Sequence, residues 1–119
     1  ISTGHLVWES LEASKKLEEI GISAEIINIH TIKPLDEEIV INSAKKTNAI
    51  VSAEEHNFLG GLGESISRTL SLNYPTPQEF IATNDTFGES GKPSDLMKKY
   101  GLDSDSIIKS VKKVISRKK

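Results

Sequence analysis

The chain of 119 residues contains no cysteine, one tryptophan and one methionine, and aromatic residues make up only 5% of it. Without cysteine it has no disulfide, no thiolate metal ligand and no cysteine nucleophile, which suits a reducing compartment. With so few aromatic rings it offers no stacking platform for single-stranded nucleic acid. The net charge of -2, from 15 basic and 17 acidic residues, gives no overall attraction to nucleic acid or to an anionic membrane.

Long apolar runs are also missing from the sequence. No run approaches the ~20 residues of a membrane-spanning helix, and the first residues do not have the pattern of a secretion signal. The hydrophobic share of 36% and the charged share of 27% are typical of a folded globular domain. We therefore expect a single domain over residues 1–119 in the cytoplasm, with neither nucleic acid nor a membrane as partner.

Short apolar runs alternate with helical stretches along the chain. The apolar runs predict strands at 1–3, 22–30, 49–53 and 80–82. Helical spacing predicts helices at 4–20, 37–47, 62–70 and 93–100 and after Asp103. Strands that alternate with helices form mostly parallel sheets, because parallel neighbours need crossover connections. The sequence therefore predicts an α/β fold with three layers, α/β/α.

Single residues mark the expected helix ends and buried faces. Gly21 is expected to end the first helix, and Asp36 and Asp103 are expected to cap two later ones. Trp8 is expected to pack in the core or in an interface. Apolar residues at helical spacing predict the buried stripes: Leu6, Ala13, Leu17 and Ile20 in the first helix, and Ile107, Ile108, Val111, Val114 and Ile115 in the last.

The first expected strand is unusually short. It has three residues before its helix begins, whereas buried parallel strands usually run to about five or six. Two explanations stay open at this point. Either the segment is an edge strand, or the chain has been excised from a longer polypeptide inside or just before this strand.

Polar residues that could bind a ligand or take part in catalysis follow the expected strands. In open α/β sheets, ligands bind at the carboxyl ends of the strands. His5, His30 and His56 each follow a strand, and Glu54 and Glu55 stand directly before His56. Imidazoles beside carboxylates are components of acid/base and metal sites. The spacing matches no known ligand pattern, however, and strand ends commonly carry polar turn residues. We therefore keep His5, His30, Glu55 and His56 as candidate ligand residues and assign no catalytic residue and no metal ligand.

A glycine-rich turn, which includes Gly60, Gly61 and Gly63, links the third expected strand to the next helix. Such turns can bring backbone N–H groups close to a phosphate at a helix N-terminus. Counted from Gly61, the third glycine of a dinucleotide fingerprint would fall at Ile66, and no P-loop lysine follows. Glu64 would also repel a phosphate. The pattern favours tight packing between strand and helix, and the three glycines stay as candidate ligand positions.

The C-terminal end of the chain is basic. It could attract an acidic partner, but cations near a helix C-terminus also stabilise the helix dipole. They lie off the apolar stripe of this helix, so a solvated face is the favoured interpretation. The basic residues are Lys109, Lys112, Lys113, Arg117, Lys118 and Lys119.

Three stretches together are similar to a known family. They are 28–36 (NIHTIKPLD), 51–63 (VSAEEHNFLGGLG) and 87–102, which contains FGESG and KYGL. In this order, and with the Ser2-Thr3-Gly4 start of the first helix, they resemble the C-terminal domain of transketolase-like thiamine diphosphate enzymes. The resemblance covers essentially the whole chain. It is greatest to the C-terminal half of the two-subunit transketolases found in many prokaryotes.

Related branches of the superfamily differ in the third stretch. Deoxyxylulose-phosphate synthase typically has His-Gly where this chain has Ser90-Gly91. The β subunits of 2-oxo acid dehydrogenases usually lack the helix ending Lys99-Tyr100-Gly101-Leu102. Both branches stay as alternatives, as does a small regulatory α/β domain that binds an anion or a nucleotide.

The resemblance implies a parent enzyme that transfers a two-carbon ketol unit reversibly between sugar phosphates. In this family the thiamine diphosphate and its Mg²⁺ or Ca²⁺ are held mainly by the pyrimidine-binding and pyrophosphate-binding domains. The C-terminal domain packs against these partners and helps the enzyme form a homo-oligomer. We therefore expect no cofactor on this domain, no catalytic or cofactor-binding residue in it, and no activity of the chain alone.

Overall fold

The computed structural model of the chain describes residues 1–2, 6–29, 35–54, 61–81 and 104–118. In chain order its elements are α1 (Leu6–Glu19), α2 (Glu37–Thr47), β1 (Ile50–Ala53), α3 (Leu62–Asn73), β2 (Gln78–Ile81) and α5 (Ser104–Ser116). The strands β1 and β2 pair in parallel, with Ile50 opposite Gln78 and Ala53 opposite Ile81. The helix expected at 93–100 lies outside the described residues. None of the described helices combines the length and the apolar character needed to cross a membrane.

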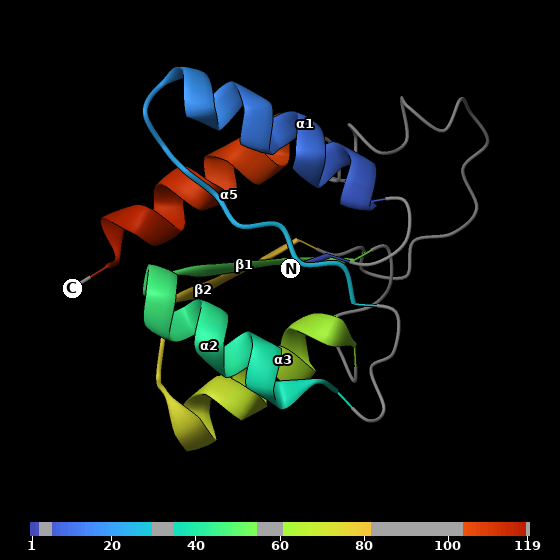
Figure 1. Ribbon diagram of the computed structural model, residues 1–119, viewed down its shortest axis with the longest axis vertical. Helices are drawn as coiled ribbons and strands as arrows, with labels where there is room; N and C mark the ends of the chain where they lie inside the picture. Colours follow the sequence, from blue (N-terminus) through green and yellow to red (C-terminus); the bar gives the residue numbers. More distant parts are fainter. Residues whose placement is uncertain (3–5, 30–34, 55–60, 82–103, 119) are drawn as a thin grey trace.

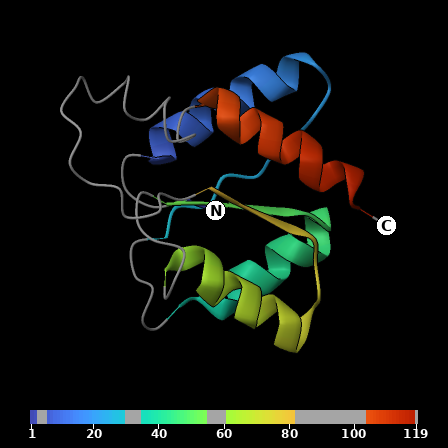
Figure 2. The ribbon, with the colours of Figure 1, turned by 180° about the vertical axis from the view of Figure 1, so that it is seen from behind.

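The sheet lies between two layers of helices. In both views α1 and α5 cover one face of the sheet, and α2 and α3 cover the other (Figures 1 and 2). The predicted α/β/α arrangement is confirmed. Buried side chains fill both interlayer spaces: Ile27, Ile29, Val40, Ala44, Ile50, Leu62, Ile66 and Leu70 toward α2 and α3, and Leu6, Ala13, Ala53, Ile81 and Ile107 toward α1 and α5.

The expected helix ends at Gly21 and Asp36 are confirmed. Gly21 has a φ of +82°, a left-handed conformation that glycine adopts without strain. The Ile22 N–H donates to the Leu17 carbonyl at 2.9 Å, which closes α1 with the hydrogen bond of a Schellman motif. The Asp36 side chain accepts from the Ile39 N–H at 3.2 Å and caps α2. The Asp103 cap lies outside the described residues.

Some expected positions in the apolar stripes are wrong. Ile20 is 56% exposed, because α1 ends at Glu19 and the Gly21 turn takes Ile20 off the buried face. Trp8 was expected in the core or in an interface; at 70% exposure it is not in the core, and the interface stays a prediction. In α5, Ile107 and Val114 are buried, whereas Ile115 is 38% exposed at the margin of the stripe.

The first expected strand consists of a bridge at Ser2, and it is not at an edge. Ser2 forms parallel bridges with Asn28 on one side and with Ala53 on the other. The edge explanation is therefore wrong, and the excision explanation stays a prediction. The strand expected at 22–30 is also absent from the described residues as a regular strand. Segment 22–26 has no neighbouring strand with which it could form a ladder.

Candidate functional site

The parallel pairing brings the carboxyl ends of the strands to one edge of the sheet. Ser2, Asn28, Ala53 and Ile81 stand at this edge, as expected for the place where ligands bind in such folds. The structure describes two of the candidate residues there, Gly61 and Gly63. The others lie outside the described residues, so their role stays a prediction: His5, His30, Glu55, His56 and Gly60.

Glu54, directly after β1, is a buried acidic residue at this edge, at 4% exposure. Its Oε1 accepts from the Leu62 N–H at 2.9 Å, and its Oε2 accepts from the Gly63 N–H at 2.5 Å. These N–H groups belong to the first turn of α3 and have no acceptor within the helix. The carboxylate also lies at the positive end of the helix dipole. Glu54 therefore caps α3 from the end of a strand.

This cap decides what the glycine-rich turn can bind. A phosphate at the start of α3 would need the same N–H groups that Leu62 and Gly63 donate to Glu54. It would also come close to Glu64, an acidic residue in the first turn of α3. The N-terminus of α3 is thus occupied by a carboxylate of the chain itself and does not fit a phosphate or a diphosphate.

Gly63 permits the close approach of α3 to the sheet. A Cβ atom at this position would lie 2.6 Å from Cδ2 of Phe80 and 2.9 Å from Oγ of Ser52. Distances under 3.0 Å require the neighbours to shift, so only glycine fits here without rearrangement. Gly61 serves as N-cap of α3 in an extended conformation, without a side-chain cap of its own.

A second polar side chain holds the same turn of α3 from β2. The Gln78 side chain is buried, and its Nε2 donates to the Gly63 carbonyl at 3.0 Å and to the Ser52 Oγ at 3.1 Å. The first turn of α3 is therefore held by Glu54 after β1 and by Gln78 in β2. Both side chains join the sheet to α3.

The basic C-terminal helix is partly engaged by the sheet. Glu79 of β2 has a side chain that is only 14% exposed. It forms ion pairs with Lys113, at 3.3 Å, and with Arg117. Arg117 Nη1 also donates to the Gln78 carbonyl at 3.1 Å. Lys109 is exposed. These contacts dock α5 onto β2 and leave the rest of its basic side as a solvated face.

The described residues contain no group of three His, Asp or Glu side chains that could hold a metal ion. The sequence did not identify Glu54 as a helix cap, because its partners lie eight and nine residues away across a turn. A usable signal was present nonetheless. A glutamate directly after a buried strand, followed by a glycine-rich helix start, has the right position to cap that helix.

These observations define an α/β domain in which Glu54 and Gln78 join the sheet to α3 and Glu79 joins it to α5. The comparison with known proteins gives the family. Residues 1–107 match the family described as transketolase, C-terminal domain. The chain belongs to this family.

Two of the similar proteins are named as parts of transketolases. The chain is 42% identical over 118 residues to the 6-deoxy-6-sulfo-D-fructose transketolase subunit SqwH of Clostridium sp. (strain MSTE9), covering 99% of the chain and 37% of that protein. It is 44% identical over 112 residues to the putative transketolase C-terminal section of Methanocaldococcus jannaschii, covering 93% of the chain and 34% of that protein. The chain thus spans little more than a third of these relatives.

A solved structure shows the same fold. It is described as a split gene transketolase, inactive beta4 tetramer, and its TM-score is 0.94 at 40% sequence identity. The likeness covers 99% of this chain and 39% of that one. The deoxyxylulose-phosphate synthase and dehydrogenase alternatives are not favoured by these comparisons.

Proposed function

We propose that the chain is the C-terminal domain of a two-subunit transketolase, excised from a longer polypeptide, and that it completes and associates the enzyme. The parent assembly would transfer a two-carbon ketol unit between sugar phosphates in the cytoplasm, as part of the pentose phosphate pathway. The match to the family over residues 1–107 and the likeness to subunits of split transketolases support this function.

The Glu54 cap is the main observation in support of a structural role for this domain. The amide donors at the start of α3 are the described groups best suited to bind an anion, and a carboxylate of the same chain uses them. The same contact counts against a regulatory domain that binds an anion or a nucleotide at this turn. The domain therefore contributes surfaces and stability rather than a ligand site at α3.

The family implies a parent enzyme that depends on thiamine diphosphate and a divalent cation, Mg²⁺ or Ca²⁺. The start of α3 does not fit the diphosphate, because the Glu54 carboxylate occupies its N–H donors and repels further negative charge. We infer that the pyrimidine-binding and pyrophosphate-binding domains of the assembly hold both groups. No step of the reaction is assigned to this chain.

The partners of this domain would be those two domains and further copies of the same subunit. The split transketolase of similar fold is described as an inactive beta4 tetramer, which supports both self-association and the lack of activity of one subunit type. The exposed Trp8 side chain on α1 supports a contact surface, since tryptophan is enriched in interfaces.

Reconstitution of the assembly tests this function. The pyrimidine-binding and pyrophosphate-binding parts of the parent enzyme would be purified without this domain and assayed for ketol transfer from a ketose phosphate to an aldose phosphate. We expect weak activity that increases when the 119-residue chain is added, and none from the chain alone. Equal activity with and without the chain, or turnover by the chain alone, would contradict the proposal.

A further inference from the structure

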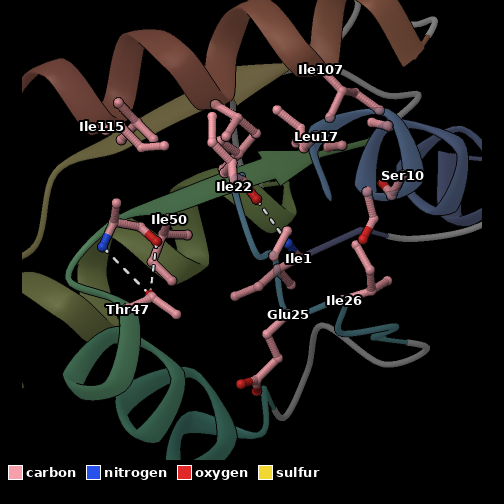
Figure 3. Close-up of a pocket in the computed structure, with 18 of the residues that line it drawn as sticks. Ile1, Ser10, Leu17, Ile22, Glu25, Ile26, Thr47, Ile50, Ile107 and Ile115 are labelled. Atoms are coloured by element: carbon pink, nitrogen blue, oxygen red, sulfur yellow. Dashed lines mark hydrogen bonds between the residues drawn. The ribbon is translucent and has the colours of Figure 1, made fainter. Parts of the chain in front are cut away.

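The strand β2 is paired on one side only in the part of the chain that the structure describes. Its neighbour β1 lies inside the sheet. It pairs with β2 on one side, and on the other side the Ile1 amine donates to the Val51 carbonyl at 2.8 Å (Figure 3). The Ala53 N–H also donates to the Ile1 carbonyl, at 2.8 Å. No described strand pairs with the other side of β2, so this side is a free edge of the sheet.

The backbone groups at the free edge belong to Gln78 and Phe80. The carbonyls of Pro77 and Ile81 accept from N–H groups of β1 and of the residue after it, at 3.0 and 2.9 Å. Successive residues of a strand direct their N–H and C=O groups to opposite sides, so those of Gln78 and Phe80 point away from β1. Among the described residues, no backbone group pairs with them. Any strand that added to β2 would have to use these groups.

A free edge of this kind can pair with the same edge of a second copy of the chain. Each copy presents both donors and acceptors, so two identical edges are complementary and can meet about a twofold axis. Phe80 favours such a contact, because its ring is a large apolar group that is 42% exposed beside the edge. Folded proteins protect their free edges against this pairing, often with charged side chains.

Arg117, directly after α5, lies on this edge. Its Nη1 donates to the Gln78 carbonyl at 3.1 Å and also pairs with the Glu79 carboxylate. The Glu79 side chain is on the α5 face of β2, whereas the Gln78 carbonyl is on the free edge, so one guanidinium group contacts both. Arg117 also borders a pocket between α3 and β2, which Ser67 and Phe80 help to line. The side chain therefore reaches from the α5 face of β2 across its edge.

The contacts around Arg117 hold it at the edge. Its backbone N–H donates to the Val114 carbonyl at 3.1 Å, which ties the residue to the last turn of α5. The Glu79 side chain is only 14% exposed, so its pairing with Arg117 is shielded from solvent more than an ordinary surface ion pair. Lys113 pairs with the other oxygen of Glu79 at 3.3 Å. Removal of the Arg117 side chain therefore leaves Glu79 with one cationic partner.

We propose that Arg117 closes the free edge of β2 and prevents it from pairing with a second copy of this chain. The guanidinium group occupies the Gln78 carbonyl, which an added strand would need, and its bulk and charge lie where that strand would run. Two copies that met edge to edge would also bring two Arg117 charges together, and like charges repel. The inference does not rest on the proposed function, because it concerns the isolated chain.

Arg117→Ala tests this closure in the 119-residue chain. Sedimentation equilibrium over a range of protein concentrations measures the dimerisation constant. Because the variant frees the Gln78 carbonyl for hydrogen bonds between two copies, we expect it to dimerise at least about tenfold more tightly than the parent chain. Lys118→Ala is the matched control, since Lys118 carries the same charge, is exposed, and forms no side-chain hydrogen bond or ion pair with a described residue. It should dimerise as the parent chain does.

A second pair of variants shows whether the added association uses the edge of β2. Phe80→Pro removes an N–H that points to the free edge and leaves the hydrogen bonds between β1 and β2 in place. In the Arg117→Ala background it should return the dimerisation constant to the parent value. Phe80→Ala in the same background keeps this N–H and should retain the tighter dimerisation. Urea denaturation of each variant checks that the chain is folded.

Hydrogen exchange of the Phe80 amide, measured by NMR, reports directly on the edge. We expect fast exchange in the parent chain, and exchange slowed at least about tenfold in concentrated Arg117→Ala, where a second copy would accept from this N–H. Equal dimerisation of Arg117→Ala and Lys118→Ala would overturn the proposal. So would tighter dimerisation that Phe80→Pro leaves unchanged, or a Phe80 amide that is already protected in the parent chain.

Discussion

The Glu54 carboxylate reaches from the end of β1 to the Gly63 N–H at 2.5 Å, and this contact fixes how α3 meets the sheet. The Glu54 N–H donates at 2.9 Å to the Ile81 carbonyl at the end of β2. One residue thus joins both described strands and the helix between them. It does so at the edge where a ligand-binding member of this fold class would place its ligand.

Replacement of Glu54 should therefore be costly for stability. In Glu54→Ala the Leu62 and Gly63 N–H groups lose their acceptor, and the negative charge at the positive helix end disappears. Hydrogen bonds to a charged group are worth about 1.5 to 3 kcal/mol, so we expect the free energy of unfolding to fall by about 2 to 4 kcal/mol. Urea denaturation measures this change.

Glu64→Gln is the matched control for the cap. Glu64 is also in the first turn of α3, but its side chain is exposed, so removal of its charge should cost less than about 1 kcal/mol. If both variants lose the same stability, the loss comes from the interaction of a negative charge with the helix dipole. The hydrogen bonds of the Glu54 cap then add nothing to it.

Gly63→Ala should destabilise the domain by overpacking. The new Cβ would lie 2.6 Å from Cδ2 of Phe80 and 2.9 Å from the buried Ser52 Oγ, so the neighbours must move. Insertion of a methyl group into a packed site typically costs about 1 to 3 kcal/mol. Because Phe80 is 42% exposed, its ring can be removed, and Phe80→Ala in the Gly63→Ala background should recover part of the loss.

Gly21→Ala provides the contrast for Gly63. A Cβ at Gly21 meets no atom within 4 Å, but the φ of +82° strains any other residue. We expect a loss of about 1 kcal/mol that Phe80→Ala does not relieve. The double-mutant cycles, measured by urea denaturation, should therefore show coupling to Phe80 at Gly63 alone. Coupling of equal size at both glycines would contradict a local clash.

Local signals made much of this fold predictable from the sequence. Gly21 and Asp36 act on backbone groups within five residues of themselves, so their types and positions were sufficient to predict two helix ends. Trp8 was different, because helical spacing shows which residues share a face but not whether another layer covers that face. Glu54 was missed as a cap for a related reason: its partners become neighbours only after β1 and α3 have packed.

The exposed Trp8 side chain should be a contact point in the assembled enzyme. It is 70% exposed on α1, and Leu11, one turn further on the same helix, is 40% exposed. We expect Trp8→Ala to change the free energy of unfolding by less than about 0.5 kcal/mol. The same change should weaken association with the partner domains by about 2 kcal/mol or more, as is typical of a buried interface tryptophan.

Leu72→Ala is the control for this surface. Leu72 is 72% exposed on α3, in the opposite helical layer, and its loss should affect neither stability nor association. Binding titrations with the partner domains would compare both variants with the parent chain. Because Trp8 is the only tryptophan of this chain, a fluorotryptophan label gives a single ¹⁹F signal that should shift on assembly. An unshifted signal, or equal affinity of all three chains, would place the interface elsewhere.

The buried Ile1 amine should make stability depend on pH between about 8 and 6. Its pKa is lowered from 8.0 to about 6 by burial, so the unfolded chain binds the proton more strongly than the folded one. Above pH 8 the amine is neutral in both states and costs nothing. As the pH falls from 8 to 6, protonation favours the unfolded chain, and below 6 the loss stays constant at about 2 to 3 kcal/mol.

Acetylation of the Ile1 nitrogen separates this effect from the three histidines, which ordinarily titrate in the same range. The acetylated nitrogen keeps an N–H for the Val51 carbonyl and cannot take up a proton, whereas the histidines are unchanged. Urea denaturation of both forms at several pH values should give curves that coincide above pH 8 and separate progressively down to pH 6, with the acetylated chain more stable. A constant difference across this range would show that the amine is solvated in both states.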